Sequence, residues 1–205
     1  MIFEIRTYRV KPGSLPEVEK RFGEAYEIRK KHSELAAFWH TEIGPLNEIV
    51  HVWPYQNLEE RGRVRAAAAK ETGWPPKLGE FVTDMQAEVL VPFAFSPTLP
   101  PGKHGPFYEL RYYTLKPGTL PDLVEGWASR IAERTKLSPL ALAGNVDIGE
   151  ANRFIHIWPY RSLDERAAIR KQAREMGIWP PPGGGDRVLT QNNKILMPAA
   201  FSPAQ

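Results

Sequence analysis

The feature that most constrains this chain is an internal duplication with a spacing of 105 residues. The segment FEIRTYRVKPGSLPEVEKRF (3–22) aligns with YELRYYTLKPGTLPDLVEGW (108–127), and eight of the twenty positions are identical. At the same offset, GPLNEIVHVWPYQNLEER aligns with GEANRFIHIWPYRSLDER, and nine of the eighteen positions are identical. Unrelated segments would match at roughly one position in twenty. The chain is therefore predicted to contain two tandem copies of one structural unit.

The boundary between the two copies lies in the Pro- and Gly-rich stretch SPTLPPGKHGP. We expect a first repeat over residues 1–97, a linker over 98–107 and a second repeat over 108–205.

Each copy contains the same predicted order of elements. FEIRTYRV and YELRYYTL alternate in polarity and are rich in β-formers, as are the two segments around the Gly-Pro-Leu-Asn turn and the last segment of each copy. Pairs with capping-box spacing precede two helices in each copy: Ser14 with Glu17, Asn57 with Glu60, Thr119 with Asp122, and Ser162 with Glu165. The order β-α-β-β-α-β predicts an α+β, ferredoxin-like unit.

Alternation along the strands divides each predicted sheet into an aliphatic and a polar face. Phe3 and Ile5 alternate with Glu4, Arg6 and Tyr8, and the second copy repeats this pattern. We expect the aliphatic face to lie under the two helices. The two polar faces would then meet, closing an intramolecular barrel around a partly polar cavity.

The composition restricts the classes of function. The chain has 205 residues, a net charge of +3 and no cysteine, and no apolar run approaches the length of a membrane span. The arginine-rich segments RGRVRAAAAK and RAAIRKQAR have helical spacing and are interpreted as solvated faces. We therefore expect a cytoplasmic protein without nucleic-acid partners. The glycine run 183–185 lacks the context of a phosphate loop and predicts a flexible turn.

Three pieces of the sequence taken together resemble the NIPSNAP family: FEIRTYRVKPGSLPEV, IVHVWPYQNLEER and the FSP that closes each copy. The resemblance covers both copies. It implies a dimeric α+β barrel, a superfamily that includes cofactor-free monooxygenases, isomerases and haem-degrading enzymes. Members are usually single domains that dimerise, and here the dimer is expected to be fused into one chain; a homodimer of the two-repeat chain stays open. Fold alone does not define chemistry.

The candidate site consists of equivalent polar residues from the two copies. His51 and His156 are candidate general bases, with a histidine hydrogen-bonded to a carboxylate as the structural alternative. Arg6, Arg111, Tyr8 and Tyr113 are candidate oxyanion stabilisers, and Glu4 and Glu109 either contact the substrate or form buried ion pairs with the arginines. Trp53 and Trp158 are expected to line the cavity. A histidine-bound metal or haem is disfavoured because no His-Glu or His-His ligand spacing is present, so no cofactor is predicted.

The two copies differ in their second predicted strands, FWHTE and AGNVD. In the first copy His40 is an additional candidate catalytic imidazole, and Phe38 on the same face is a candidate substrate contact. In the second copy Asn145 takes the place of His40 and is also a candidate substrate contact. This asymmetry predicts that His51 matters more than His156. The facing Glu/Arg/Tyr and His/Trp sets of the two copies predict that catalysis depends on cavity residues from both. Each Trp-Pro-Pro segment, beginning at Trp74 and Trp179, is expected to form a structural corner away from the histidines.

Two functions from different classes fit these patterns. One is a cofactor-independent monooxygenase, isomerase or lyase acting on a small hydrophobic, aromatic or enolisable compound. The alternative is a non-catalytic binding or scaffold protein with an ion-pair-filled barrel.

Overall fold

The computed structural model describes residues 1–181 and 184–205. The elements of the first repeat are β1 (Ile2–Val10), α1 (Leu15–Arg29), β2 (Ala37–Ile43), β3 (Glu48–Tyr55), α2 (Leu58–Ala68) and β4 (Val82–Pro92). Those of the second are β5 (Phe107–Leu115), α3 (Leu120–Ala128), α4 (Ile131–Thr135), β6 (Leu142–Ile148), β7 (Arg153–Tyr160), α5 (Leu163–Glu175), α6 (Gly184–Arg187) and β8 (Val188–Pro198). The predicted β-α-β-β-α-β order is confirmed in both repeats, and the second repeat adds the short helices α4 and α6.

The predicted glycine turn falls partly on Gly183, which lies outside the described residues, and Gly184 begins α6. Within residues 1–181 and 184–205, no helix has the length and apolar character that crossing a membrane requires.

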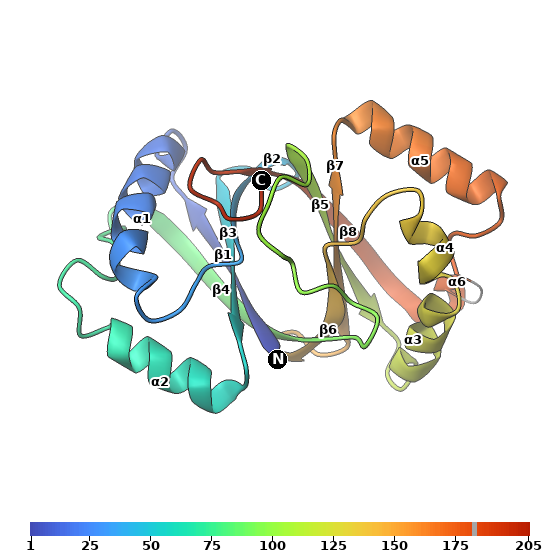
Figure 1. The fold of residues 1–205 in the computed structure, drawn as a ribbon, viewed down its shortest axis with the longest axis horizontal. Helices are drawn as coiled ribbons and strands as arrows, with labels where there is room; N and C mark the ends of the chain where they lie inside the picture. Colours follow the sequence, from blue (N-terminus) through green and yellow to red (C-terminus); the bar gives the residue numbers. More distant parts are fainter. Residues whose placement is uncertain (182–183) are drawn as a thin grey trace.

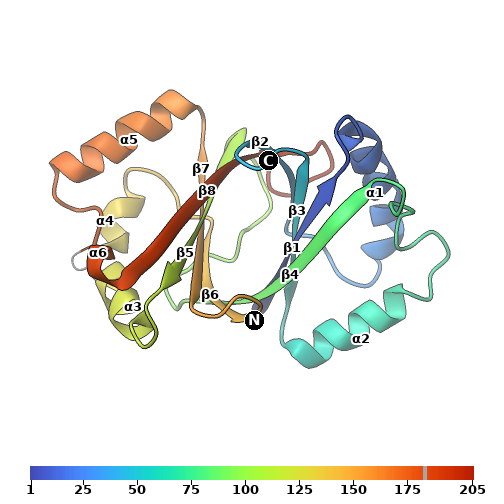
Figure 2. The same cartoon turned by 180° about the vertical axis from the view of Figure 1, so that it is seen from behind.

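The eight strands form one closed antiparallel barrel in the order β1-β3-β2-β8-β5-β7-β6-β4. Two seams join the repeats, β2 with β8 and β4 with β6, and they are related by the approximate twofold symmetry of the duplication. Helices α1 and α2 cover the outside of one half of the barrel, and α3, α4 and α5 cover the other (Figure 1). Seen from behind, the long strands β4 and β8 lie in front and run across the two halves of the molecule (Figure 2). The predicted intramolecular α+β barrel is confirmed.

The prediction of which sheet face lies inside is wrong. The barrel interior is one apolar cluster that draws on both repeats, including Phe3 and Ile5 of β1 and Leu110 of β5. The opposite face, with Tyr8 and Trp53, packs under the helices of its own repeat. Each polar face is therefore covered by helices, and the two polar faces do not meet.

The reversal has a physical reason. An eight-stranded barrel is only wide enough for side chains to fill its interior, so the aliphatic residues of both repeats pack best there. The polar face can be covered by helices because α2 carries its own counter-charges. Arg61 and Arg65, which the sequence placed on a solvated face, reach the fully buried Glu4.

Two of the four predicted helix caps are confirmed. Asn57 and Ser162 each accept a hydrogen bond from the backbone N–H three residues later. Ser14 and Thr119 instead donate their hydroxyls to backbone carbonyls three residues earlier. The first helix of each repeat starts without a side-chain cap.

The FSP segments after β4 and β8 are exchanged between the repeats. Ser202 Oγ accepts a hydrogen bond from the backbone N–H of Phe38, and Ser96 Oγ accepts the equivalent bond from Ala143. Phe201 enters the helix-covered cluster of the first repeat, where its ring lies 4.8 Å from that of Phe38. Phe95 packs in the same way in the cluster of the second repeat. Each repeat thus completes the sheet–helix layer of the other.

Candidate functional site

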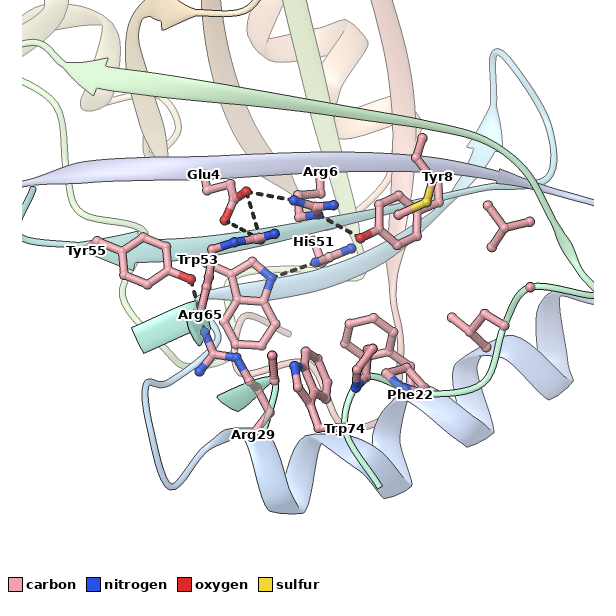
Figure 3. Close-up of a pocket in the computed structure, with 17 residues that line it drawn as sticks. Glu4, Arg6, Tyr8, Phe22, Arg29, His51, Trp53, Tyr55, Arg65 and Trp74 are labelled. Atoms are coloured by element: carbon pink, nitrogen blue, oxygen red, sulfur yellow. Dashed lines mark hydrogen bonds and ion pairs between the residues drawn. The ribbon is translucent and has the colours of Figure 1, made fainter. Parts of the chain in front are cut away.

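Each repeat contains its own cavity between the polar sheet face and the covering helices. The first cavity measures about 360 Å³, within the range of small-molecule sites. Figure 3 shows side chains from β1, β3, α1 and the Trp-Pro-Pro segment around it. The lining polar and aromatic residues are Glu4, Arg6, Tyr8, Phe22, Arg29, His51, Trp53, Tyr55, Arg65 and Trp74.

The second cavity measures about 350 Å³ and is built from equivalent positions. Its polar and aromatic lining residues are Arg111, Tyr113, Trp127, Arg134, His156, Trp158, Tyr160, Arg170, Arg174, Trp179 and Gln191. Neither lining draws on the other repeat, so the prediction of one cavity shared by both copies is wrong.

His51 lies on β3, and its hydrogen bond with Trp53 determines which ring nitrogen bears the proton. Trp53 Nε1 donates a hydrogen bond to His51 Nδ1 over 2.6 Å (Figure 3). An indole N–H can only donate, so Nδ1 must be the acceptor and a neutral ring must carry its proton on Nε2. His51 Nε2 has no hydrogen-bond partner among the described residues. Trp158 and His156 repeat this arrangement at 2.7 Å.

Both rings are held neutral. Burial, followed by the positive charges of Arg6 and Arg65, lowers the pKa of His51 well below its usual value. Burial and nearby arginines do the same to the pKa of His156. The basic lone pair of each ring is already occupied by a tryptophan, and the free nitrogen bears a proton. Each histidine is therefore placed as a hydrogen-bond donor, which contradicts the predicted role of general base.

A second group of donors lies beside His51. Arg6 donates through Nε to the Tyr8 hydroxyl (2.7 Å) and through a terminal nitrogen to Glu4 (2.8 Å). Because the Tyr8 oxygen accepts this bond, its own proton remains available to another acceptor. Burial raises the pKa of Tyr8 despite the charge of Arg6, so the hydroxyl keeps that proton. Arg111, Tyr113 and Glu109 have the same geometry in the second repeat.

Glu4 is a counter-charge rather than a free base. It accepts hydrogen bonds from Arg6, Arg61 and Arg65. Burial alone would raise the pKa of Glu4, but the hydrogen bond from Arg61 and the charges of Arg65 and Arg6 outweigh burial and hold the pKa below its usual value.

Arg29 is a buried cation that forms no ion pair with a carboxylate in the described part of the chain. Its side chain donates to the Tyr55 hydroxyl (3.0 Å) and to Ser33 Oγ (2.8 Å), and its guanidinium lies 4.5 Å from the centre of the Trp53 ring. The residue is 2% exposed. Burial is the largest cause of the lowered pKa of Arg29, and the attraction of Glu4, which is not bonded to it, is a smaller effect in the opposite direction.

Arg134 occupies the equivalent place in the second repeat, with Tyr160 and Ser138 as its partners. Arg29 and Arg134 were missed in the sequence, although each pair of matching residues, Arg29 with Arg134 and Tyr55 with Tyr160, is identical at the offset of 105.

Some predicted site residues lie outside the cavity linings. His40 binds Glu19 of α1 at 2.7 Å, and this hydrogen bond raises the pKa of His40. Phe38 is fully buried behind the site, its ring centre 5.7 Å from that of His51. Asn145 and the fully buried Glu109 do not line the second cavity. The remaining predicted residues, Glu4 and the Arg, Tyr, His and Trp pairs, do line the cavities.

The prediction for the Trp-Pro-Pro segments is wrong in its main point. Trp74 and Trp179 line the cavities together with His51 and His156. In the first cavity the Trp74 ring lies 6.0 Å from that of Trp53. Each tryptophan therefore lies at its site and not away from the histidines.

The two cavities differ in their positive charge. Arg65 donates to both oxygens of Glu4, whereas the matching Arg170 approaches Glu109 only to 3.9 Å and donates no hydrogen bond to it. Instead, the side-chain amide of Asn193 on β8 donates a hydrogen bond to Glu109. Arg174 stands where the first repeat has Ala69, so the second cavity has additional cationic character.

Among the described residues, no group of three or more His, Cys, Asp or Glu side chains is arranged to hold a metal ion.

Comparisons with known proteins agree with the duplicated fold. The NIPSNAP family model matches residues 3–97 and again 108–203. The human protein NipSnap homolog 3A is 28% identical over 99% of this chain and 85% of its own length. The mouse protein NipSnap homolog 3B is 30% identical over 98% and 85%.

Solved structures fall into two groups. A NIPSNAP family protein from Agrobacterium tumefaciens is 37% identical over 47% of this chain and 92% of its own, with a TM-score of 0.45. A monooxygenase-like protein from Lactobacillus acidophilus matches 96% of this chain and 92% of its own with a TM-score of 0.64 and 12% identity. An anthrone oxidase-like protein matches 97% and 91%, also with a TM-score of 0.64, at 11% identity. At such identities the second group shows the fold alone.

The closed ring of two βαββαβ units, with a helix-covered cavity in each, defines an α+β barrel protein in which the dimer is contained in one chain. By the match of both repeats, the chain belongs to the NIPSNAP family.

Proposed function

We propose that each repeat binds a small, partly aromatic compound through an oxygen atom that carries or develops a negative charge. The observation that carries this proposal concerns the guanidinium groups of Arg29 and Arg134. Both are buried, and neither forms an ion pair with a carboxylate among the residues that the structure describes. A buried charge is costly unless it is compensated, and a ligand oxyanion would compensate it. The unpartnered Nε2–H of His51 and the hydroxyl proton of Tyr8 are further donors in the same cavity.

The aromatic walls favour a flat ligand. Trp53, Trp74 and Phe22 line the first cavity, and Trp158, Trp179 and Trp127 line the second. Aromatic rings stack favourably on such surfaces. A phenol or an enol with an attached ring therefore fits both the charge and the shape of the lining.

The proposed chemistry is cofactor-independent stabilisation of an enolate or phenolate. Donors that surround a bound oxygen favour its anionic form, and isomerisation, lyase reactions and monooxygenation by dissolved dioxygen can all pass through such an anion. With the basic nitrogen of His51 bonded to Trp53 and Glu4 bonded to three arginines, the substrate's proton would leave to water.

Binding can be tested with 4-nitrophenol, whose anion absorbs visible light. We expect two sites per chain in the unmodified protein and a pKa of the bound phenol lowered by about 1 unit. Arg29→Met and Arg134→Met should each remove one site, and the double variant should remove both. Arg21→Met is the matched control, because Arg21 lies on the same helix α1 but pairs with Glu17 and Glu80 outside the cavity. Unchanged binding by the double variant would refute the proposal.

A non-catalytic binding role is the second candidate, and it is favoured because none of the lining residues that the structure describes is a free base. Benzoylacetone, an aromatic 1,3-diketone, separates the two. An enzyme should accelerate deuterium exchange at its central carbon by roughly tenfold or more, an effect that Arg29→Met and Arg134→Met together should abolish. Binding without acceleration would favour the non-catalytic role.

A further inference from the structure

A third cavity of about 210 Å³ is the only one of the three described that both repeats line, and its charges are distributed unequally between them. It adjoins the apolar interior of the barrel at Ile5 and Ile155. The first repeat contributes the acids Glu48 and Glu88, and the second contributes the bases Arg153 and Lys194. The remaining residues with charged or aromatic side chains are Arg9 and Tyr112.

Two ion pairs join the repeats across this cavity. Lys194 Nζ lies 2.8 Å from a Glu48 oxygen, and both side chains are almost completely buried. Arg153 lies 2.8 Å from a Glu88 oxygen, and both side chains are 15% exposed. At such burial a pair is strongly sensitive to replacement of one partner.

The four residues occupy only two structural positions. Glu48 and Arg153 correspond at the offset of 105, because Glu48 is opposite Arg9 in the ladder and Arg153 is opposite the matching Thr114. Glu88 and Lys194 correspond at an offset of 106, because Glu88 is opposite Ile5 in the ladder and Lys194 is opposite the matching Leu110.

The position of Glu48 and Arg153 is the first, and that of Glu88 and Lys194 is the second. In a barrel built from two identical repeats, the first position of each copy would face the second position of the other copy, so the same contact would form twice. Two first repeats would place Glu48 against Glu88, and two second repeats would place Arg153 against Lys194. Both arrangements bring like charges together in a poorly solvated place. Only a first repeat with a second repeat gives two attractive pairs.

We propose that these four charges specify the pairing of the repeats: each repeat takes its complement as partner and rejects a second copy of itself. Partner choice is achieved by repulsion in the wrong barrels as well as by attraction in the right one. Arg9 also contacts Glu48, and Glu150 also contacts Arg153, each within its own repeat. Neither alters this pattern, since the Arg9 side chain is 55% exposed and that of Glu150 is 49% exposed, and both can turn into solvent.

Two double variants of the full chain with the same added and removed charges test the proposal. Glu48→Lys/Lys194→Glu reverses one pair but keeps both pairs within the chain attractive. Glu88→Lys/Lys194→Glu makes both pairs within the chain repulsive and makes each repeat complementary to itself. Light scattering after size-exclusion chromatography should give the first variant the mass of the unmodified protein. The second should have at least twice that mass, because its barrels form between chains.

Equal masses and equal unfolding midpoints for the two double variants would overturn the proposal. If Glu88→Lys/Lys194→Glu does not fold, the thermal midpoints of two other variants decide. Lys194→Glu alone should lower the midpoint by about 5 °C or more, and adding Glu48→Lys should restore at least half of that loss. A midpoint that the added Glu48→Lys leaves unchanged or lowers further would equally refute the proposal.

Discussion

Trp53 Nε1 lies 2.6 Å from His51 Nδ1, and this one contact decides which nitrogen of a buried histidine bears the proton. Two residues apart on β3, the side chains share one face of the sheet. Trp158 and His156 form the same contact on β7, so the second repeat serves as a control for changes made in the first.

The first prediction concerns this contact. Long-range ¹H–¹⁵N correlation spectra should show the Nε2–H tautomer for both His51 and His156 at neutral pH. Trp53→Phe removes the donor to Nδ1, so the signals of His51 should move toward a tautomer mixture while those of His156 stay in place. An unprotonated Nε2 in the unmodified protein would contradict the assignment of His51 as a donor.

The second prediction concerns pH. Unfolded histidines titrate near pH 6.5, whereas folding holds the pKa of His51 and His156 well below that value. Below about pH 6.5 the unfolded chain therefore binds protons that the folded chain does not. The stabilisation is complete above that pH and is lost as the pH falls, by up to about 1.4 kcal/mol per pH unit for each histidine.

Urea unfolding at several pH values between about 6.5 and 5 measures this slope. His51→Asn and His156→Asn should each remove about half of it, because the asparagine oxygen can still accept from the tryptophan without titrating. His51→Asn should also weaken phenolate binding in the first cavity. A slope unchanged in the double variant would contradict the prediction.

The third prediction concerns the exchanged tails. Phe201→Ala should lower the free energy of unfolding by about 2–3 kcal/mol and weaken ligand binding in the first cavity, because Phe201 packs on Phe38 and Phe22. Phe95→Ala, its matched control, should affect the second cavity through Trp127. Binding measured in the Arg29→Met and Arg134→Met backgrounds separates the two cavities. The exchange would be disproved if Phe201→Ala weakened binding in the second cavity and Phe95→Ala weakened binding in the first.

The fourth prediction separates two matching arginines. Arg65→Ala removes the one hydrogen bond that Glu4 Oε2 accepts among the described residues, while Oε1 keeps those from Arg6 and Arg61. This loss should cost about 1–3 kcal/mol of stability. Arg170→Ala breaks no hydrogen bond to Glu109 and should change stability by about 0.5 kcal/mol or less. It should instead weaken 4-nitrophenolate binding in the second cavity. Thermal unfolding and absorbance titration of both variants provide the comparison, and the reverse order of stability losses would contradict it.

The architecture was predictable from the sequence because the repeat supplied two copies of each pattern. Alternation located the strands, and the duplication itself suggested the closure of two sheets into one barrel. Alternation also separated Glu4 and His51 from Phe3 and Val52, but it could not say which set faces inward. That choice depended on the narrow barrel interior and on Arg61 and Arg65 of α2, whose helical spacing resembles an ordinary solvated surface.

The candidate site was predictable where it lies on strands. Arg6, Tyr8, His51 and Trp53 lie together because they share one face of β1 and β3. Arg29 was not predicted as a site residue because it lies in the last turn of α1, where basic residues are common. The donor role of the histidine was also hidden, since tautomers depend on contacts that spacing alone does not reveal.

The exchange of tails also bears on how such a chain can evolve. Phe201 and Ser202 complete the layer around the first cavity, and Phe95 and Ser96 complete the second. A recombination event that transplanted one half into another protein would carry its cavity away from the tail that covers it. The two repeats are therefore expected to be inherited together. Substitutions that change the ligand specificity of one cavity depend on the other repeat being kept, because its tail completes that cavity.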